Sequence, residues 1–207
     1  MGIAQRKERQ KAELRDQILT AAREIVLTEG FEALSMRKIA EAIEYSPATI
    51  YLHFATRDEI ALQLVREGFA QLLLAMAPVQ SIVDPTERLM EIGRRYIHFA
   101  MEQPETYRLI FMENPKFSSE VIGQILNNPS EPGERAFAIL AETVGELIAQ
   151  KRFRPVDPEQ AAEVLWAGVH GVASLRIACH AAGTKLSEDM EKQSELMLEV
   201  MMRGLTA

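Results

Sequence analysis

The sequence predicts an all-α protein of about nine helices, built as a small N-terminal three-helix domain followed by a larger helical bundle. Three observations lead to this prediction. Apolar residues recur at intervals of three and four through most of the 207 residues. Glycine and proline are sparse and fall between the periodic segments. No segment of useful length alternates apolar and polar residues with β-branched enrichment, so strands are not expected.

The periodicity and the breaks between periodic segments set the order of the helices. The expected helices cover residues 10–28, 35–45, 47–54, 56–76, 84–102, 105–112, 134–151, 158–182 and 187–203. Residues 113–133 are rich in proline and asparagine, which predicts loop with at most one short helix near 118–126. We place the domain boundary between residues 57 and 58, with the helix at 56–76 connecting the domains 1–57 and 58–207.

Capping residues mark most of these helix ends. Gly30 suits the C-terminus of the first helix, because its backbone can adopt a positive φ. Ser35 is a suitable N-cap for the second helix, and Ser46 followed by Pro47 predicts the start of the third. Thr56 and Glu59 have the spacing of a capping box.

Residues 35–54 therefore form two short helices joined by a three- to four-residue turn, the pattern of a helix-turn-helix. In that motif the second helix enters the major groove of DNA, about 12 Å wide, and the first helix braces it. Many such turns contain glycine, whereas this one has Glu44 near that place.

The charge distribution is compatible with DNA binding by the first domain. The whole chain has a net charge of −7. Residues 1–57 hold 9 basic and 8 acidic side chains, a net +1, whereas residues 58–207 hold 14 and 22, a net −8. A locally basic face can bind phosphates although the rest is acidic, because screening limits charge effects to roughly 10 Å.

Composition also predicts where the protein works and what it lacks. The single cysteine, Cys179, excludes an internal disulfide and suits a cytoplasmic protein. No uninterrupted apolar stretch approaches 18 residues and no signal core begins the chain, so we expect no membrane span. The four histidines at 53, 98, 170 and 180 have no metal-ligand spacing, so we expect no metal and no cofactor.

Residues 14–70 closely resemble the TetR family of transcriptional regulators, without gaps. The resemblance is carried by Leu34-Ser35-Met36-Arg37-Lys38-Ile39-Ala40-Glu41-Ala42 and by Ser46-Pro47-Ala48-Thr49-Ile50-Tyr51-Leu52-His53-Phe54. It implies a ligand-responsive regulator, expected to be a repressor, that binds a palindromic double-stranded DNA operator as a homodimer. A run from Trp166 to Gly171 also resembles the tryptophan-histidine-glycine pattern of one C-terminal subclass.

The resemblance assigns DNA contacts to ten residues, namely Ser35, Arg37, Lys38, Ser46, Pro47, Ala48, Thr49, Tyr51, His53 and Arg57. Their chemistry fits these roles. Hydroxyl and basic groups can bind phosphates, and Pro47 and Ala48 can touch thymine methyl groups. Arg6, Lys7, Arg9 and Lys11 form a basic arm, expected to be flexible. Phe54 is expected in the core and Tyr51 at the surface.

The resemblance also implies two roles for the second domain. Dimerisation is expected through the last two helices, at 158–182 and 187–203. An unknown small molecule is expected in an apolar pocket lined by Tyr96, Phe99, Tyr107, Phe111, Phe117, Trp166 and His170. Ordinary core packing is the alternative explanation for each of these aromatic residues.

Two other functions agree less well with the sequence. An interaction or scaffold protein that retains the fold would not need the polar groups Thr49, Tyr51, His53 and Arg57, which are present. An enzyme would need an organised nucleophile, base or metal cluster, and the sequence contains no G-x-S-x-G motif and no phosphate-binding glycine loop. We therefore expect no enzymatic activity.

Overall fold

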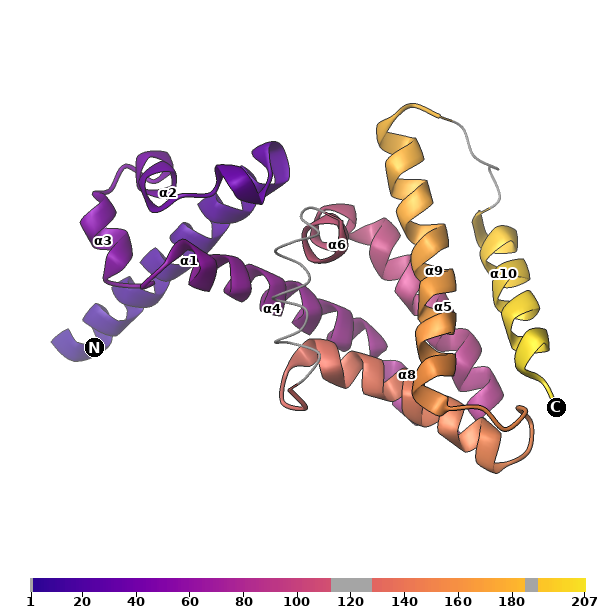
Figure 1. Ribbon diagram of the computed structural model, residues 1–207. Coiled ribbons are helices and arrows are strands. Elements are labelled where there is room, and N and C mark those ends of the chain that lie inside the picture. The colour runs from indigo at the N-terminus through magenta and orange to yellow at the C-terminus, as the bar shows by residue number, and fades with distance from the viewer. Residues whose placement is uncertain (1, 113–127, 185–189) are drawn as a thin grey trace. The chain divides into compact units, whose positions relative to one another are not determined.

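The computed structural model describes residues 2–112, 128–184 and 190–207 (Figure 1). In these residues the chain forms nine α-helices and two short 3-10 helices, as the all-α prediction requires. The chain divides into two compact units. The N-terminal unit comprises Met1–Gly68 with Arg108–Gln124, and the C-terminal unit comprises Phe69–Tyr107 with Ile125–Ala207.

The N-terminal unit is built on a long first helix. Helix α1 spans Ile3–Glu29, and Gly30 ends it with φ +81° and an N–H that donates to the Val26 carbonyl. A 3-10 turn, η1 (Phe31–Ala33), leads to α2 (Met36–Ala42) and α3 (Pro47–Tyr51). The core is formed by fully buried aliphatic side chains of α1, α2, α3 and α4, namely Ile18, Ala22, Val26, Ile39, Ile50 and Ile60.

Helix α4 (Arg57–Met76) runs from the N-terminal unit into the C-terminal one. The N–H of Glu59 donates to Thr56 Oγ1 over 3.1 Å, and Glu59 Oε2 accepts from the N–H of Ala55 over 2.7 Å. The predicted cap is therefore present, with its return bond one residue earlier than expected. The predicted domain boundary falls at the start of this helix, whose residues through Gly68 belong to the N-terminal unit.

In the described part of the chain, Arg57–Ser81 is long and apolar enough to cross a membrane by length and composition. The packing accounts for this apolarity. Ile60, Leu64, Phe69 and Leu72 are buried in the protein. A helix that buries its apolar face in a core passes the same test, so we assign α4 to the core.

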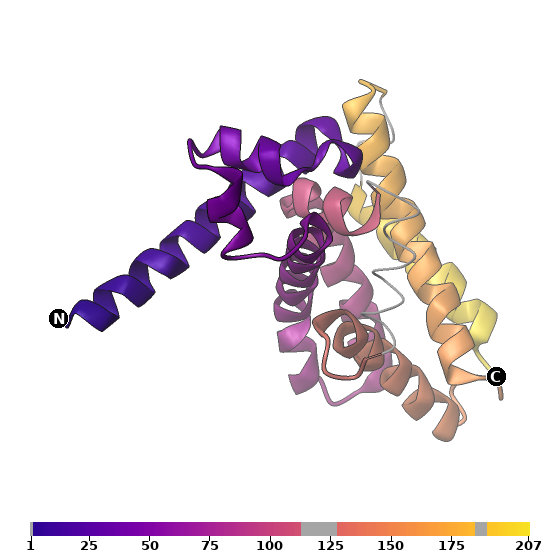
Figure 2. The ribbon, with the colours of Figure 1, turned by 60° about the vertical axis from the view of Figure 1, so that its left-hand side comes forward.

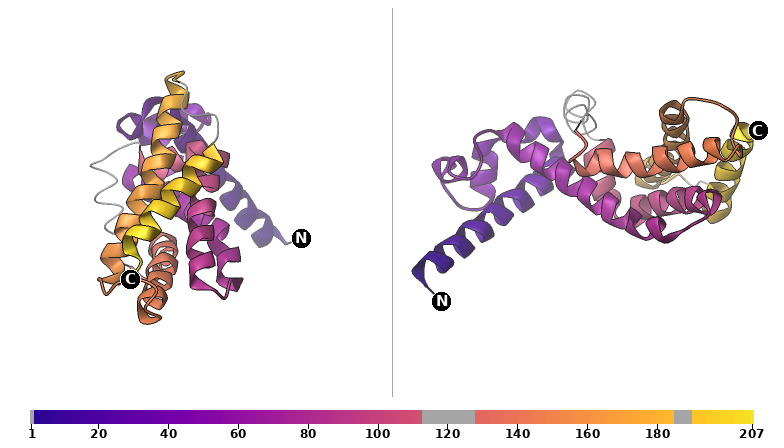
Figure 3. Two further views of the ribbon diagram at one scale, coloured as in Figure 1. Left: turned by 90° about the vertical axis from the view of Figure 1, so that its right-hand side faces the viewer. Right: turned by 90° about the horizontal axis from the view of Figure 1, so that it is seen from below.

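The C-terminal unit is a helical bundle. After η2 (Ala77–Ser81) come α5 (Pro85–Glu102), α6 (Pro104–Phe111), whose last residues belong to the N-terminal unit, α8 (Pro132–Ala149), α9 (Pro158–Ala181) and α10 (Met190–Leu205). Asp84 caps α5 and Asp157 caps α9 through backbone N–H groups, as the sequence predicts. Helices α9 and α10 lie side by side (Figures 2 and 3). The loop helix expected near 118–126 and the cap expected at Ser187 lie outside the described residues.

Two glycines allow α10 to approach its neighbours closely. A Cβ atom on Gly93 of α5 would lie 2.4 Å from Cδ2 of Leu198. A Cβ atom on Gly168 of α9 would lie 2.1 Å from Sδ of Met201. Both distances are far below van der Waals contact, so any other residue at either glycine would have to displace the α10 side chain that faces it.

Candidate functional site

The pair of helices α2 and α3 is held by local caps and by one unusual turn residue. Oγ of Ser35 accepts from the N–H of Lys38 over 3.2 Å, and Oγ of Ser46 accepts from the N–H of Thr49 over 3.3 Å. Between the helices, Glu44 has φ +59°, in the left-handed region that favours glycine. The helix-turn-helix predicted for residues 35–54 is therefore present, and the turn imposes on Glu44 the conformation usually given to glycine.

Helix α3 buries one face and exposes the other. Ile50 and Phe54 are fully buried, and the guanidinium of Arg15 lies 4.1 Å from the centroid of the Phe54 ring. Tyr51 is 57% exposed. Phe54 in the core and Tyr51 at the surface are as the sequence predicts.

The ten predicted contact residues fall into two groups by exposure. Seven are exposed, namely Ser35, Arg37, Ser46, Pro47, Ala48, Tyr51 and Arg57. Three are half-buried, namely Lys38, Thr49 and His53. All ten belong to the N-terminal unit, on or beside α2 and α3. Their contact with DNA stays a prediction, because the structure contains the protein alone.

The basic side chains of this surface are paired with neighbouring oxygens. Nε of Arg37 lies 2.8 Å from Oε1 of Glu41, and Lys38 pairs with Glu29. The pair with Glu41 raises the pKa of Arg37. Nη1 of Arg57 donates to the Leu34 carbonyl over 3.4 Å. An anionic partner would have to compete with these carboxylates.

The hydroxyl and imidazole groups on α3 are partly committed to the fold. The hydroxyl of Thr49 lies 2.9 Å from that of Ser46, so both belong to the cap of α3. Burial lowers the pKa of His53, and Lys11 and Arg15 lower it further. His53 is therefore uncharged near neutral pH.

Two exposed residues of this surface were not among the predicted contacts. Leu52 is 78% exposed and Tyr45 is 47% exposed. The inward spacing of Ile50 and Phe54 already places residue 52 on the outer face, so the periodicity contained the signal for Leu52.

The basic N-terminal segment is helical, which corrects the prediction of a flexible arm. Residues from Ile3 onward belong to α1, and Oε1 of Gln5 accepts from the N–H of Gly2. Arg9 pairs with Glu13 one turn later, at 3.0 Å. Strong helix formers between Gln5 and Glu13 extend the helix, and the basic side chains are exposed along it.

Four of the predicted pocket residues meet in one hydrogen-bonded cluster in the C-terminal unit. Oη of Tyr107 on α6 lies 2.6 Å from Nδ1 of His170 on α9. Oη of Tyr96 on α5 lies 3.2 Å from the same nitrogen and accepts from Nε1–H of Trp166 over 3.1 Å. Burial raises the pKa of both tyrosines and lowers that of His170, so all of these groups are neutral.

The other three predicted pocket residues do not join this cluster through any described contact. Phe99 is a buried core residue of α5. Phe111 belongs to the N-terminal unit. Phe117 lies outside the described residues.

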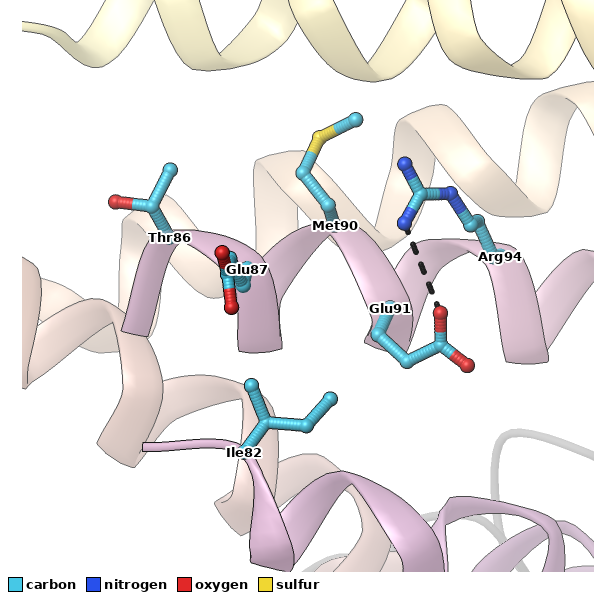
Figure 4. Close-up of a pocket in the computed structure, with 6 residues that line it drawn as sticks. All are labelled: Ile82, Thr86, Glu87, Met90, Glu91 and Arg94. Atoms are coloured by element: carbon cyan, nitrogen blue, oxygen red, sulfur yellow. Dashed lines mark ion pairs between the residues drawn. The ribbon is translucent and has the colours of Figure 1, made fainter. Parts of the chain in front are cut away.

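An open groove of about 430 Å³ lies elsewhere in the C-terminal unit, on α5 (Figure 4). It is lined by Ile82, Thr86, Glu87, Met90, Glu91 and Arg94. Arg94 pairs with Glu91 at the groove and with Glu195 of α10. In the described part of the chain, no three His, Cys, Asp or Glu side chains are grouped suitably for a metal ion.

Comparison with protein families assigns the chain. Residues 18–64 match the family described as bacterial regulatory proteins, tetR family. Residues 89–201, more than half of the chain, match the tetracyclin repressor-like C-terminal domain. The chain belongs to the TetR family. Both matches agree with the resemblance deduced from the sequence, although neither addresses the tryptophan-histidine-glycine subclass.

Characterised TetR-type regulators resemble parts of the chain. The HTH-type transcriptional regulator TcmR of Streptomyces glaucescens is 43% identical over 61 residues, which are 30% of this chain and 26% of TcmR. The HTH-type transcriptional activator FasR of Mycolicibacterium smegmatis is 26% identical over 114 residues, which are 55% of this chain and 52% of FasR. The chain thus matches a quarter to about half of the length of these relatives.

Solved structures share the fold of this TetR-family protein over nearly the whole chain. The regulator FadR from Bacillus subtilis, in complex with stearoyl-CoA, has a TM-score of 0.72 at 19% identity, covering 91% of this chain and 98% of FadR. PfmR from Thermus thermophilus, also of the TetR family, has a TM-score of 0.63 at 20% identity, covering 92% of this chain and 99% of PfmR.

Proposed function

We propose that the protein is a sequence-specific transcription regulator, a dimeric repressor that leaves a palindromic operator when a small molecule binds its C-terminal unit. The single observation that supports DNA binding best is the presentation of α3. Its inner face is buried at Ile50 and Phe54, whereas its N-terminal residues and Tyr51 face solvent. Family membership supports the same function.

The chemistry of this surface suits a DNA groove. The N-terminus of a recognition helix enters the major groove, where Pro47 and Ala48 would touch thymine methyl groups. Arg37 and Arg57 flank α3 in the sequence and would bind phosphates, and Tyr51 would add a hydroxyl contact. Phosphate contacts position the protein, and the α3 residues would select the bases.

The exposed apolar residues of α9 and α10 support the homodimer. Val164 and Leu175 lie three turns apart on α9, Leu196 and Val200 lie one turn apart on α10, and each is 59–63% exposed in the single chain. A two-fold interface that joins these helices from two chains would remove all four side chains from water.

Sedimentation of two matched variants tests the interface. Val200→Glu should give a monomer, because it puts a charge into the proposed contact. Leu74→Glu changes a side chain that is 74% exposed on α4 and should leave the dimer intact. A dimeric Val200→Glu variant, or an equal effect of both changes, would remove α10 from the interface.

Selection of bound sequences from a random double-stranded DNA library tests the main proposal. We expect a palindrome with half-sites about one helical turn apart and an affinity that falls steeply with salt. Arg37→Ala and Tyr51→Ala should weaken binding while the dimer persists. Arg154→Ala removes an exposed arginine of the C-terminal unit and serves as the control. No enrichment by an intact dimer would refute the proposal and favour a protein partner.

Transcription from a promoter that contains the selected operator separates repressor from activator. FasR is named an activator, so the direction of control needs its own measurement. We expect less transcript with the protein than without it. We assign the protein no enzymatic activity, and a hydrolysis screen of the purified dimer checks that part of the proposal.

A further inference from the structure

The hydrogen bonds of the cluster determine which nitrogen of His170 carries the proton. The phenol of Tyr107 stays protonated, because burial raises its pKa. The imidazole stays neutral, because burial lowers its pKa. Since Oη of Tyr107 lies 2.6 Å from Nδ1 and 3.5 Å from the His170 carbonyl, the phenol donates to Nδ1. The proton of the neutral ring is then on Nε2, which makes Nε2–H a donor.

Aromatic rings surround this donor. The ring centroids of Trp166 and His170 lie 6.1 Å apart, and that of Phe137 on α8 lies 6.3 Å from Trp166 in an edge-on arrangement. All three side chains are only half-buried, whereas Tyr96 and Tyr107 behind them are buried. The bond from Trp166 Nε1–H to Tyr96 holds the indole in place. We call Phe137, Trp166 and His170 the aromatic wall.

We propose that the aromatic wall binds an uncharged, planar aromatic effector whose carbonyl oxygen accepts a hydrogen bond from Nε2–H of His170. This inference rests on the proposed function, because it assigns the effector that the C-terminal unit would sense. The flat ligand face would pack on Trp166 and Phe137, whose rings stack or meet edge-on with aromatic partners. The carbonyl would supply the polar contact that fixes orientation.

The surroundings of the aromatic wall favour an uncharged ligand. Its polar partners are two phenols, one indole N–H and one neutral imidazole, so the cluster offers no opposite charge to an ionised ligand. Glu134 lies one turn before Phe137 on α8, and its pKa is raised by burial and by the nearby Glu159. A second anion there would add to that repulsion.

The fluorescence of Trp166 tests the inference directly, because it is the only tryptophan in the chain. The probes are 9-fluorenone, which is neutral and planar with one carbonyl, fluorene, which has the same ring skeleton without it, and the anion 9-fluorenone-2-carboxylate. We expect saturable quenching by fluorenone, with fluorene and the carboxylate each bound about tenfold more weakly. No saturable quenching by fluorenone, or equal affinities for the three probes, would overturn the proposal.

Variants locate the contact. His170→Phe keeps a ring and removes the donor, so it should erase the preference for fluorenone over fluorene. Phe137→Leu should weaken both compounds alike. His98→Phe, at an exposed histidine of α5, is the control. Circular dichroism checks that each variant is folded, and Phe137→Leu serves as the second test if His170→Phe is not. A His170→Phe variant that keeps the preference contradicts the proposal.

The failure of this inference is distinguishable from failure of the proposed function. A palindrome from the library selection, without fluorenone binding, would leave the regulator standing and remove the aromatic wall as its sensor. Fluorenone binding without any selected DNA would do the reverse.

Discussion

Tyr107 and His170, 63 residues apart in the chain, are joined by the 2.6 Å contact between Oη and Nδ1. This bond requires an unprotonated Nδ1, and burial lowers the pKa of His170 below the ordinary value of 6.5. The folded state therefore binds a proton at this site less readily than the unfolded chain does.

Stability should consequently fall as the pH decreases. Above pH 6.5 both states are neutral at His170, and the contribution is complete. Below it the unfolded state takes up a proton first, and stability is lost as the pH falls through the folded pKa. Urea unfolding between about pH 7.5 and 5.5 should show a shallower loss in His170→Phe than in the parent. The same slope in both would disprove the assignment, and His180→Phe, at a histidine of the same helix outside the cluster, is the control.

The ion pair of Arg37 and Glu41 should reduce affinity for the operator. Glu41→Gln releases the guanidinium for phosphates, so we expect binding to tighten by about two- to fivefold. Glu24→Gln removes the same charge from the exposed side of α1 and should have little effect. Fluorescence anisotropy with the selected operator measures both. Equal tightening by the two variants would show a general charge effect and not release of Arg37.

Glu44 should be replaceable by glycine with a gain in stability. Its φ of +59° is costly for a residue with a Cβ atom, so Glu44→Gly should raise the free energy of unfolding by about 1 kcal/mol. Glu24→Gly, inside regular helix α1, should instead lower it by about 1 kcal/mol. Denaturant titration distinguishes the two signs, and a loss in Glu44→Gly would contradict the turn geometry.

Gly93 should not tolerate a methyl group. Its Cβ would lie 2.4 Å and 3.0 Å from the two δ carbons of Leu198, which is buried, so Gly93→Ala should cost about 1–3 kcal/mol of stability. Gly171→Ala is the matched control, because a Cβ there meets nothing within 4 Å and alanine favours the helix. Thermal unfolding of both variants gives the comparison. A neutral Gly93→Ala would mean that α10 packs less closely on α5.

The local features of this fold were predictable, and the long-range ones were not. The caps at Ser35, Ser46 and Asp157 each depend on neighbours within three residues, so sequence spacing identifies them. The bond between Tyr107 and His170 depends on how α6 packs against α9, which no spacing encodes. Sequence reasoning identifies both residues as aromatic or polar pocket candidates but cannot pair them.

The basic N-terminus shows the opposite error. Its charges suggest a solvated arm, whereas its helix propensity decides the structure. The pair of Arg9 and Glu13 at a spacing of four residues is a local signal for a helix. Charge alone therefore gives too little weight to backbone preference.

Helix α6 begins in the C-terminal unit at Pro104 and passes into the N-terminal unit at Arg108, where Leu109 and Ile110 are buried. The N-terminal unit is thus assembled from two separate stretches of chain. A chimera that exchanged residues 1–68 alone would draw this unit from two different parents. Gene recombination among relatives should therefore yield well-folded products more often when residues 108–112 are inherited together with the first 68.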